Sequence, residues 1–114
     1  MKLNVTYRGL RTEKTVLVTV DNAELPSRTD LRNHSPTGFE WGYEGSGPAQ
    51  LALAILCDFL QDDQKALQYY QEFKRDIISP IGSQTWTIHS DSITEWYRRK
   101  LRESRDNAGK GPVY

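Results

Sequence analysis

An aromatic, glycine-dense segment is the part of this chain whose residue types most suggest a binding site. Residues 38–48 interleave glycines with Phe39, Trp41 and Tyr43 and end in Gly-Ser-Gly-Pro. Neither helix nor strand propensity favours such a mixture. A glycine-rich turn before a helix can direct backbone N–H groups at a phosphate. Here Pro48 lacks one donor and the segment has no Gly-Lys-Ser/Thr ending, which argues against a phosphate site.

Two interpretations of this segment stay open. In the first, the loop folds tightly over the end of a buried helix and belongs to the core. In the second, it presents an aromatic platform to a protein partner, because Trp and Tyr anchor interfaces out of proportion to their frequency. The acidic residues beside the aromatic ones would suit basic or apolar groups on that partner. The partner-binding candidates are Phe39, Glu40, Trp41, Tyr43, Glu44 and Ser46.

A second candidate surface is the basic stretch near the C-terminus. Residues 98–110 contain six basic and two acidic residues. On a helix, arginines at i, i+4 and i+7 share one face and could contact nucleic-acid phosphates, or an acidic protein that mimics or holds nucleic acid. A solvated helix end, where basic side chains are electrostatically favoured, explains the same pattern. The nucleic-acid-binding candidates are Arg98, Arg99, Arg102 and Arg105.

Catalytic and metal-binding constellations are sparse. Cys57 lies in an apolar stretch, where a cysteine is more often a small buried residue than a nucleophile. His34, Ser35 and Glu40 could form an acid/base group, but loop residues of these types more often bond to the backbone. His34 and His89 are far apart, and no cluster has metal-ligand spacing. We expect no enzyme, no metal site and no cofactor; a small ligand or an active site at the glycine-rich loop is a distant alternative.

Length, charge and cysteine content limit the classes of protein to which this chain can belong. At 114 residues the chain should form one domain. Its 15 basic and 15 acidic residues balance, so the molecule as a whole has no pull toward nucleic acid or acidic membranes. A lone cysteine and the lack of a signal-peptide pattern favour a reducing, cytoplasmic setting. The longest apolar run is too short to cross a membrane, which takes about 20 residues.

Local patterns predict the order of secondary-structure elements. Alternating apolar residues indicate two strands joined by a hairpin loop, in which Gly9 supplies a left-handed conformation. The spacing of Ser92 and Glu95 is that of a capping box and predicts the start of the last helix. The expected elements are strands at 3–7 and 16–20 around a loop at 9–13, a long loop at 21–37, helices at 48–60 and 62–79, a strand at 84–89 and a helix from 92.

These elements predict an α+β fold. Its small antiparallel sheet should have three or four strands, the fourth at residues 38–43, and about three helices should cover one face. The helix at 48–60 is apolar on nearly every side, so most of it should be buried. We expect a single compact domain at residues 1–106 and a flexible tail at 107–114.

The segment from His34 to Ala54 resembles the signature of a family of small uncharacterised proteins. The similarity rests on HSP from His34, GFEWGY from Gly38 and GSGPAQLALA from Gly45. That family is found in bacteria, phages and other mobile elements and has no known activity. Glu44 departs from it, because a glycine is expected at that position. The resemblance implies a small accessory protein of phage or mobile-element origin that binds and inhibits a host defence component, as an anti-CRISPR protein does.

Two functional hypotheses follow. The leading one is an accessory protein that binds a protein partner through the loop at residues 39–47. The alternative is a nucleic-acid-associated protein that uses the arginines of the last helix. Neither requires a membrane, and neither predicts an oligomeric state.

Overall fold

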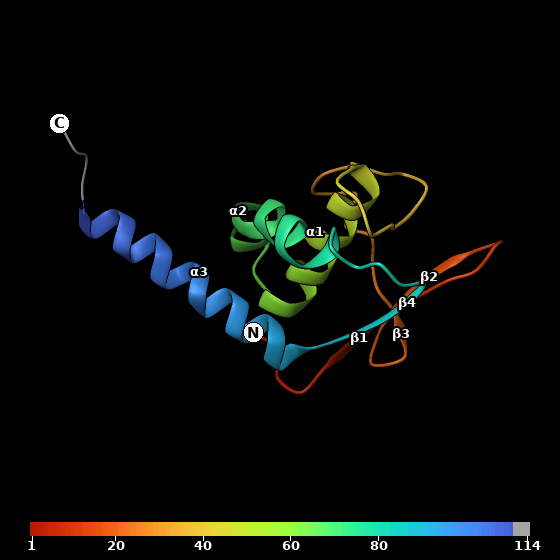
Figure 1. The fold of residues 1–114 in the computed structure, drawn as a ribbon, viewed down its shortest axis with the longest axis horizontal. Helices are drawn as coiled ribbons and strands as arrows, with labels where there is room; N and C mark the ends of the chain where they lie inside the picture. The colour runs from red at the N-terminus through yellow and green to blue at the C-terminus, as the bar shows by residue number, and fades with distance from the viewer. Residues whose placement is uncertain (111–114) are drawn as a thin grey trace.

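The computed structural model describes residues 1–110, with side chains described through residue 106 (Figure 1). Within this part of the chain, four strands and three α-helices confirm the expected α+β class. The strands are β1 (Thr6–Arg11), β2 (Val16–Val20), β3 (Ala23–Glu24) and β4 (Thr85–His89). The helices are α1 (Ser46–Leu60), α2 (Asp63–Phe73), which continues into a π-helical segment η1 (Lys74–Ile78), and α3 (Ser90–Lys110).

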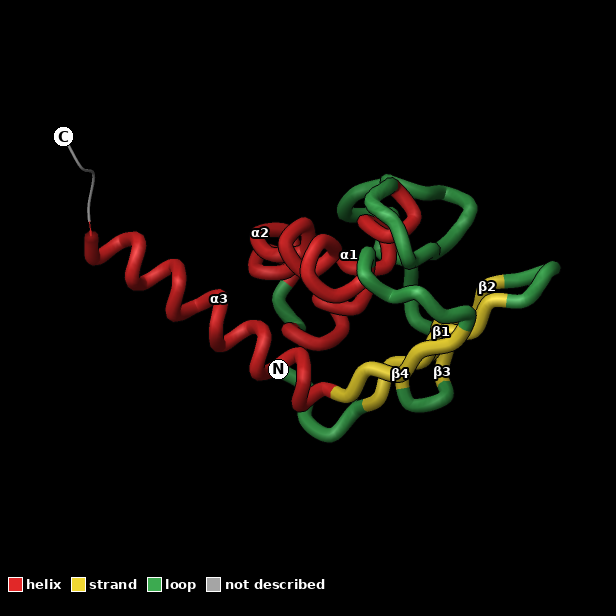
Figure 2. Tube along the Cα trace, viewed as in Figure 1, coloured by secondary structure: helices red, strands yellow, loops and turns green. Residues whose placement is uncertain are grey.

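The four strands form one antiparallel sheet in the order β3-β2-β1-β4. Because side chains alternate along a strand, Tyr7, Val18 and Trp86 point to one face and are buried there. Leu10 and Leu17 point to the other face and are exposed. Helices α1 and α2 lie on the buried side (Figure 2), so the sheet is covered on one face, as its alternating pattern predicts.

Strand β1 is displaced from its predicted position. It spans Thr6–Arg11 instead of residues 3–7, and Gly9 lies in its middle, between Val18 on β2 and Trp86 on β4. A side chain at Gly9 would overlap the indole of Trp86. The predicted loop at 9–13 is therefore wrong, because this glycine permits close packing of a ring instead of a left-handed turn.

The fourth strand also differs from the prediction. It is the short β3, which pairs with β2 through a two-residue turn at Asp21 and Asn22. Both turn residues have positive φ, 46° and 69°, which is the conformation of a tight hairpin turn and suits Asp and Asn. Residues 38–43, predicted as this strand, form no strand.

Helix α1 is the centre of the core. Its residues from Gly47 to Cys57 are all buried, which confirms the prediction from its uniformly apolar composition. The helix begins two residues before Pro48, after Gly45, and Ala49 N–H donates to the Gly45 carbonyl at 3.0 Å. It ends at Gln61, whose left-handed backbone lets its N–H bond to the Cys57 carbonyl.

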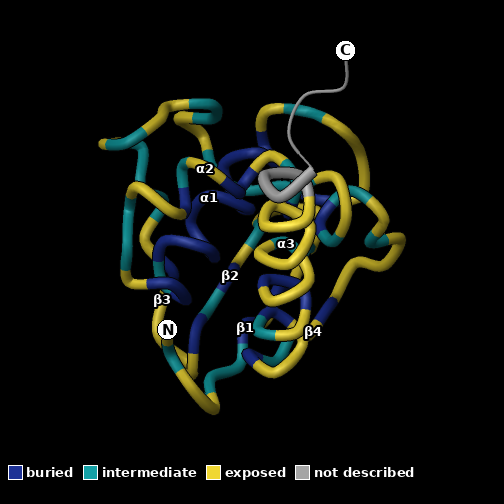
Figure 3. The backbone as a smooth tube through the Cα atoms, turned by 90° about the vertical axis from the view of Figure 1, so that its left-hand side faces the viewer, coloured by how far each residue is buried: buried dark blue, intermediate teal, exposed yellow. Residues whose placement is uncertain are grey.

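Only the first half of α3 packs on the body of the molecule. Trp96 meets Phe73 edge to face at a centroid distance of 5.0 Å, and Tyr97 meets Tyr69 at 5.3 Å. Trp96 Nε1 also donates to Asp76 Oδ2 at 3.0 Å. Residues 101–106 are all exposed (Figure 3), and α3 projects away from the body (Figure 1). The molecule is consequently elongated, with extents of 54 × 29 × 28 Å.

Both predicted ends of α3 need correction. The helix begins at Ser90, so Ser92 and Glu95 lie inside it and form no capping box. The N–H of Asp91 instead bonds to His89 Nδ1 at 3.1 Å. At the other end the helix includes residues 107–110, which the sequence placed in a flexible tail. Residues 111–114 of that predicted tail lie outside the described residues.

Candidate functional site

Trp41 belongs to the core and not to a platform. Its side chain is 1 % exposed and meets Trp86 edge to face at 5.6 Å. Its Nε1 donates to the Ser83 carbonyl at 2.8 Å, so the polar atom of the ring is satisfied inside the protein. The platform interpretation is therefore wrong for Trp41, and the interpretation that the loop folds onto the core is confirmed there.

Arg11 fastens the loop to the sheet. Its Nε donates to Glu40 Oε1 at 3.0 Å, and its Nη2 donates to the Trp41 carbonyl at 3.0 Å. Its guanidinium carbon also lies 4.4 Å from the centre of a Trp41 ring, in cation–π geometry. A further bond, from Nη1 to Gln84 Oε1 at 2.7 Å, reaches the segment before β4. One side chain thus joins three segments that are far apart in sequence.

The two glutamates of the loop are already paired. Glu40 accepts from Arg11, and Glu44 Oε2 lies 2.8 Å from Lys74 Nζ. The hydrogen bond from Lys74 lowers the pKa of the Glu44 carboxyl. Both carboxylates already have a basic partner within the chain, which weakens the basic-partner form of the platform interpretation and leaves its apolar form open. The Cβ and Cγ atoms of Glu40 also pack over Gly47 in the first turn of α1, so that turn is covered by this side chain.

The backbone of the loop depends on glycine at position 42. Gly42 has φ +88°, which side-chain-bearing residues rarely adopt, and a Cβ there would come within 2.7 Å of the Ile81 carbonyl oxygen. Its N–H bonds to the Ile78 carbonyl at 3.2 Å. The loop is therefore pressed against the end of the π-helical segment, and this close packing explains the glycine at position 42.

Gln50 fixes the long loop before the glycine-rich segment. This fully buried side chain accepts hydrogen bonds at Oε1 from the N–H groups of His34 and Ser35. Its Nε2 donates to the Ser27 carbonyl at 2.6 Å. The His34 ring bonds to the Tyr70 hydroxyl at 2.7 Å, whereas the Glu40 carboxylate bonds to Arg11. His34 and Glu40 thus have separate partners, and the suggested acid/base group is not assembled.

An open groove lies between the tip of the β1–β2 hairpin and the glycine-rich loop; we call it the hairpin–loop groove. Its volume is about 620 Å³. Tyr43 lies at this groove with 50 % of its surface exposed, and its ring packs on Gly45. Phe39 is half-buried against the core, and Ser46 is exposed. The groove is lined by residues 11–16 of the hairpin and by residues 35, 37–40, 43, 46 and 47.

Four of the six loop candidates therefore line one groove: Phe39, Glu40, Tyr43 and Ser46. The opposite wall, residues 11–16, was not predicted to take part in binding. No local pattern marks it, because its position depends on Arg11 reaching Glu40 and Gln84 across long sequence separations.

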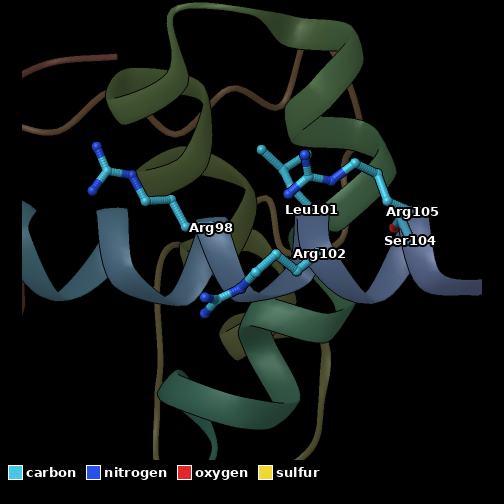
Figure 4. A pocket seen from close by; sticks show the side chains of 5 residues that line it. All are labelled: Arg98, Leu101, Arg102, Ser104 and Arg105. Atoms are coloured by element: carbon cyan, nitrogen blue, oxygen red, sulfur yellow. The ribbon is translucent and has the colours of Figure 1, made fainter.

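The arginines of α3 form a separate surface, the basic arm, which we define as α3 from Arg98 onward (Figure 4). Arg98, Arg99, Arg102 and Arg105 are all exposed, and none forms an ion pair with a carboxylate of residues 1–106. Lys100 differs, because it bonds to Asp76 at 3.0 Å and lies 3.5 Å from Glu103. The arm does not meet the hairpin–loop groove, so the two predicted surfaces are independent.

Two further features concern the residues that the structure describes. These residues contain no group of three or more His, Cys, Asp or Glu side chains arranged to hold a metal ion. No helix among them combines the length and the apolar character that crossing a bilayer requires.

Cys57 is buried on α1, with 3 % of its surface exposed. Burial raises the pKa of its thiol to about 11. Because the thiolate is the reactive form of cysteine, a buried thiol with this pKa is a poor nucleophile near neutral pH.

We expect the Cys57 thiol to react with DTNB at pH 8 at least about 100-fold more slowly in the native protein than in urea. The reason is that raising the pKa of the thiol from 9.0 to about 11 leaves about one hundredth of the thiolate at this pH. Absorbance at 412 nm measures both rates. The Cys57→Ser variant gives the blank, and equal rates in the two states would show that this part of α1 opens readily.

Comparisons with known proteins give one match. The model of a family described as a family of unknown function (DUF6166) matches residues 7–99. No curated protein and no solved structure matches this chain. The matched range contains the whole hairpin–loop groove and ends two residues into the basic arm.

Proposed function

The chain belongs to the DUF6166 family of unknown function, and we propose that it acts by binding a protein partner in the hairpin–loop groove. The groove lies entirely within the range that the family model matches. A binding role at this place can therefore be common to the family, whereas most of the basic arm lies outside the range.

The half-exposed ring of Tyr43 at the groove carries this proposal. The ring is held against Gly45, and the loop around it is fixed by buried Trp41 and by Arg11. A rigid aromatic side chain loses little conformational entropy on binding, and Tyr is enriched among residues that dominate interface energies. Tyr43 is therefore the expected anchor of the interface.

The charges around the groove indicate the chemistry of the partner. Glu40 and Glu44 are neutralised by Arg11 and Lys74, so basic side chains on a partner gain little there. Hydroxyl groups of Thr37 and Ser46 are exposed at the groove and can form hydrogen bonds. The partner should present an apolar or aromatic side chain to Tyr43, surrounded by hydrogen-bonding groups.

We further propose that the protein is a phage or mobile-element accessory protein that inhibits a host defence component in the cytoplasm, as anti-CRISPR proteins do. The resemblance of the segment at residues 34–54 supports this setting. A single buried cysteine fits a reducing compartment. A small chain whose rigid loop presents one aromatic anchor is suited to act by occupying a partner.

The test compares capture of partners from bacterial lysate by the wild type and by Tyr43→Ala. Loss of a central aromatic anchor costs about 2 kcal/mol or more, so Tyr43→Ala should weaken binding of the captured protein about 30-fold. The matched control is Leu17→Ala, which removes a similarly exposed apolar side chain from the open sheet face. Titration of the captured protein measures the three affinities.

Equal affinities of wild type and Tyr43→Ala would overturn the groove as the binding site. The inhibitor role needs a second readout: expression of the wild type, but not of Tyr43→Ala, should raise the plating efficiency of a phage that the host restricts. If neither protein changes plating while the affinity still depends on Tyr43, binding stands and the anti-defence role does not.

A further inference from the structure

Beyond Lys100, the basic arm does not pack on the described body of the molecule. The part of α3 at its base packs on the body through Trp96, Tyr97 and Lys100, but every residue from 101 to 106 is exposed. Helical stability in proteins comes mainly from packing, and isolated helices shorter than about 12 residues are marginal in water. A projecting helical end therefore gains stability from any partner that covers it.

The arm also carries an excess of positive charge, because residues 98–106 contain five basic and two acidic residues. Four of its guanidinium groups form no ion pair with a described carboxylate, as reported above for Arg98, Arg99, Arg102 and Arg105. Three of them, Arg98, Arg102 and Arg105, follow the i, i+4, i+7 spacing and share one face of the helix, and Figure 4 shows their side chains extending from α3. Charge complementarity thus requires an anionic partner.

The side chains of the arm favour a duplex over a single strand. Proteins that bind single strands stack bases on exposed aromatic rings, and residues 98–106 contain no aromatic side chain. The nearest rings, those of Trp96 and Tyr97, are buried against α2. The arm presents positive charges along a helix, and such an arrangement suits phosphates at regular spacing.

The shape of the arm selects duplex DNA over duplex RNA. A helix with its side chains is about 10–12 Å across, and the major groove of B-form DNA is about 12 Å wide. The major groove of an RNA duplex is deep and too narrow for side chains to read. Because α3 stands clear of the body beyond Lys100, the arm can approach a groove without a clash from the other helices (Figure 1).

We propose that the basic arm binds the major groove of duplex DNA through contacts of Arg98, Arg99, Arg102 and Arg105 with backbone phosphates. These contacts do not distinguish base sequence. This is a second binding activity, independent of the hairpin–loop groove. The family match ends at residue 99, so it includes Arg98 and Arg99, whereas Arg102 and Arg105 lie beyond the matched range.

Salt dependence of binding tests the proposal. If four arginines each neutralise one phosphate, affinity for a 20-base-pair mixed-sequence duplex should fall about 150-fold between 50 and 200 mM NaCl. The triple variant R98Q/R102Q/R105Q leaves one arginine, so its affinity should fall only about 3.5-fold over the same range. Glutamine keeps the helix propensity of arginine, and circular dichroism checks that α3 is intact. Fluorescence anisotropy measures the affinities.

The matched control is R8Q/R32Q/K65Q, which removes the same charge from three exposed residues outside the arm. This control should keep the wild-type salt dependence; a loss equal to that of the arm variant would overturn the proposal, because net charge alone would then explain binding. A single strand or an RNA duplex of the same length should bind more weakly than duplex DNA, and equal or tighter binding would overturn the assignment to the duplex groove.

Absence of duplex binding at 50 mM NaCl would also overturn the proposal and favour an acidic protein as the occupant of the arm. Tyr43→Ala should leave DNA binding unchanged, whereas R98Q/R102Q/R105Q should leave capture of the protein partner unchanged. Failure of one binding activity is therefore distinguishable from failure of the other.

Discussion

Alanine at position 9 should destabilise the protein by at least about 2 kcal/mol, since overpacking a filled core commonly costs 1–3 kcal/mol and more where neighbours cannot move. The new Cβ would overlap the Trp86 indole. Trp86 cannot yield easily, because Trp41 lies edge-on against it at 5.6 Å. Urea unfolding followed by tryptophan fluorescence measures the change.

Gly82→Ala is the matched control for Gly9→Ala. No atom lies within 4 Å of a Cβ at Gly82, and its backbone is not left-handed, so its free energy of unfolding should change little. If the two variants were equally stable, Gly9 would not lie over Trp86, and the hairpin loop predicted at residues 9–13 would be the better description.

Trp41→Ala should destabilise the protein by about 3–5 kcal/mol, the usual cost of truncating a large buried aromatic side chain. The variant loses the contact with Trp86, the cation–π contact of Arg11 and the bond to the Ser83 carbonyl. Much of a marginally stable domain would then be unfolded. Thermal unfolding by circular dichroism measures the loss.

The neighbouring Tyr43 provides the internal comparison. Tyr43→Ala should change the free energy of unfolding by no more than about 0.5 kcal/mol, because its side chain is half-exposed. Trp41→Phe should fall between the two, since it keeps an aromatic ring but loses the Nε1 donor. A Trp41→Ala variant as stable as Tyr43→Ala would contradict the burial of Trp41 and restore the aromatic platform.

Local sequence patterns were sufficient for most elements of the fold. Helix α1 could be predicted because its apolar residues surround nearly the whole circumference, which is typical of a helix buried on most sides. Strands β2 and β4 followed from alternation, since one of their faces meets the core and the other meets water. These signals are local, so no knowledge of distant residues was needed.

The errors at Gly9 and at the start of α3 have a common cause. The sequence predicted a turn at Gly9 because glycine permits unusual φ angles. In the structure Gly9 pairs with Trp86, which is far away in sequence. Ser92 and Glu95 had the spacing of a cap, but Ser90 continues directly from β4 and its Oγ accepts from the Val5 N–H. In both places a non-local contact prevailed over local propensity.

For the two binding surfaces as well, some features could be predicted from local sequence and others depended on contacts between distant residues. The sequence by itself determined that residues 38–47 are unusual and that the last helix is basic, because composition and spacing record both. Only the tertiary structure decided that Trp41 points inward while Tyr43 points outward, and that Arg11 brings the hairpin beside the loop. Burial and pairing depend on which distant segments meet; a sequence pattern describes a residue's neighbours along the chain and not its neighbours in space.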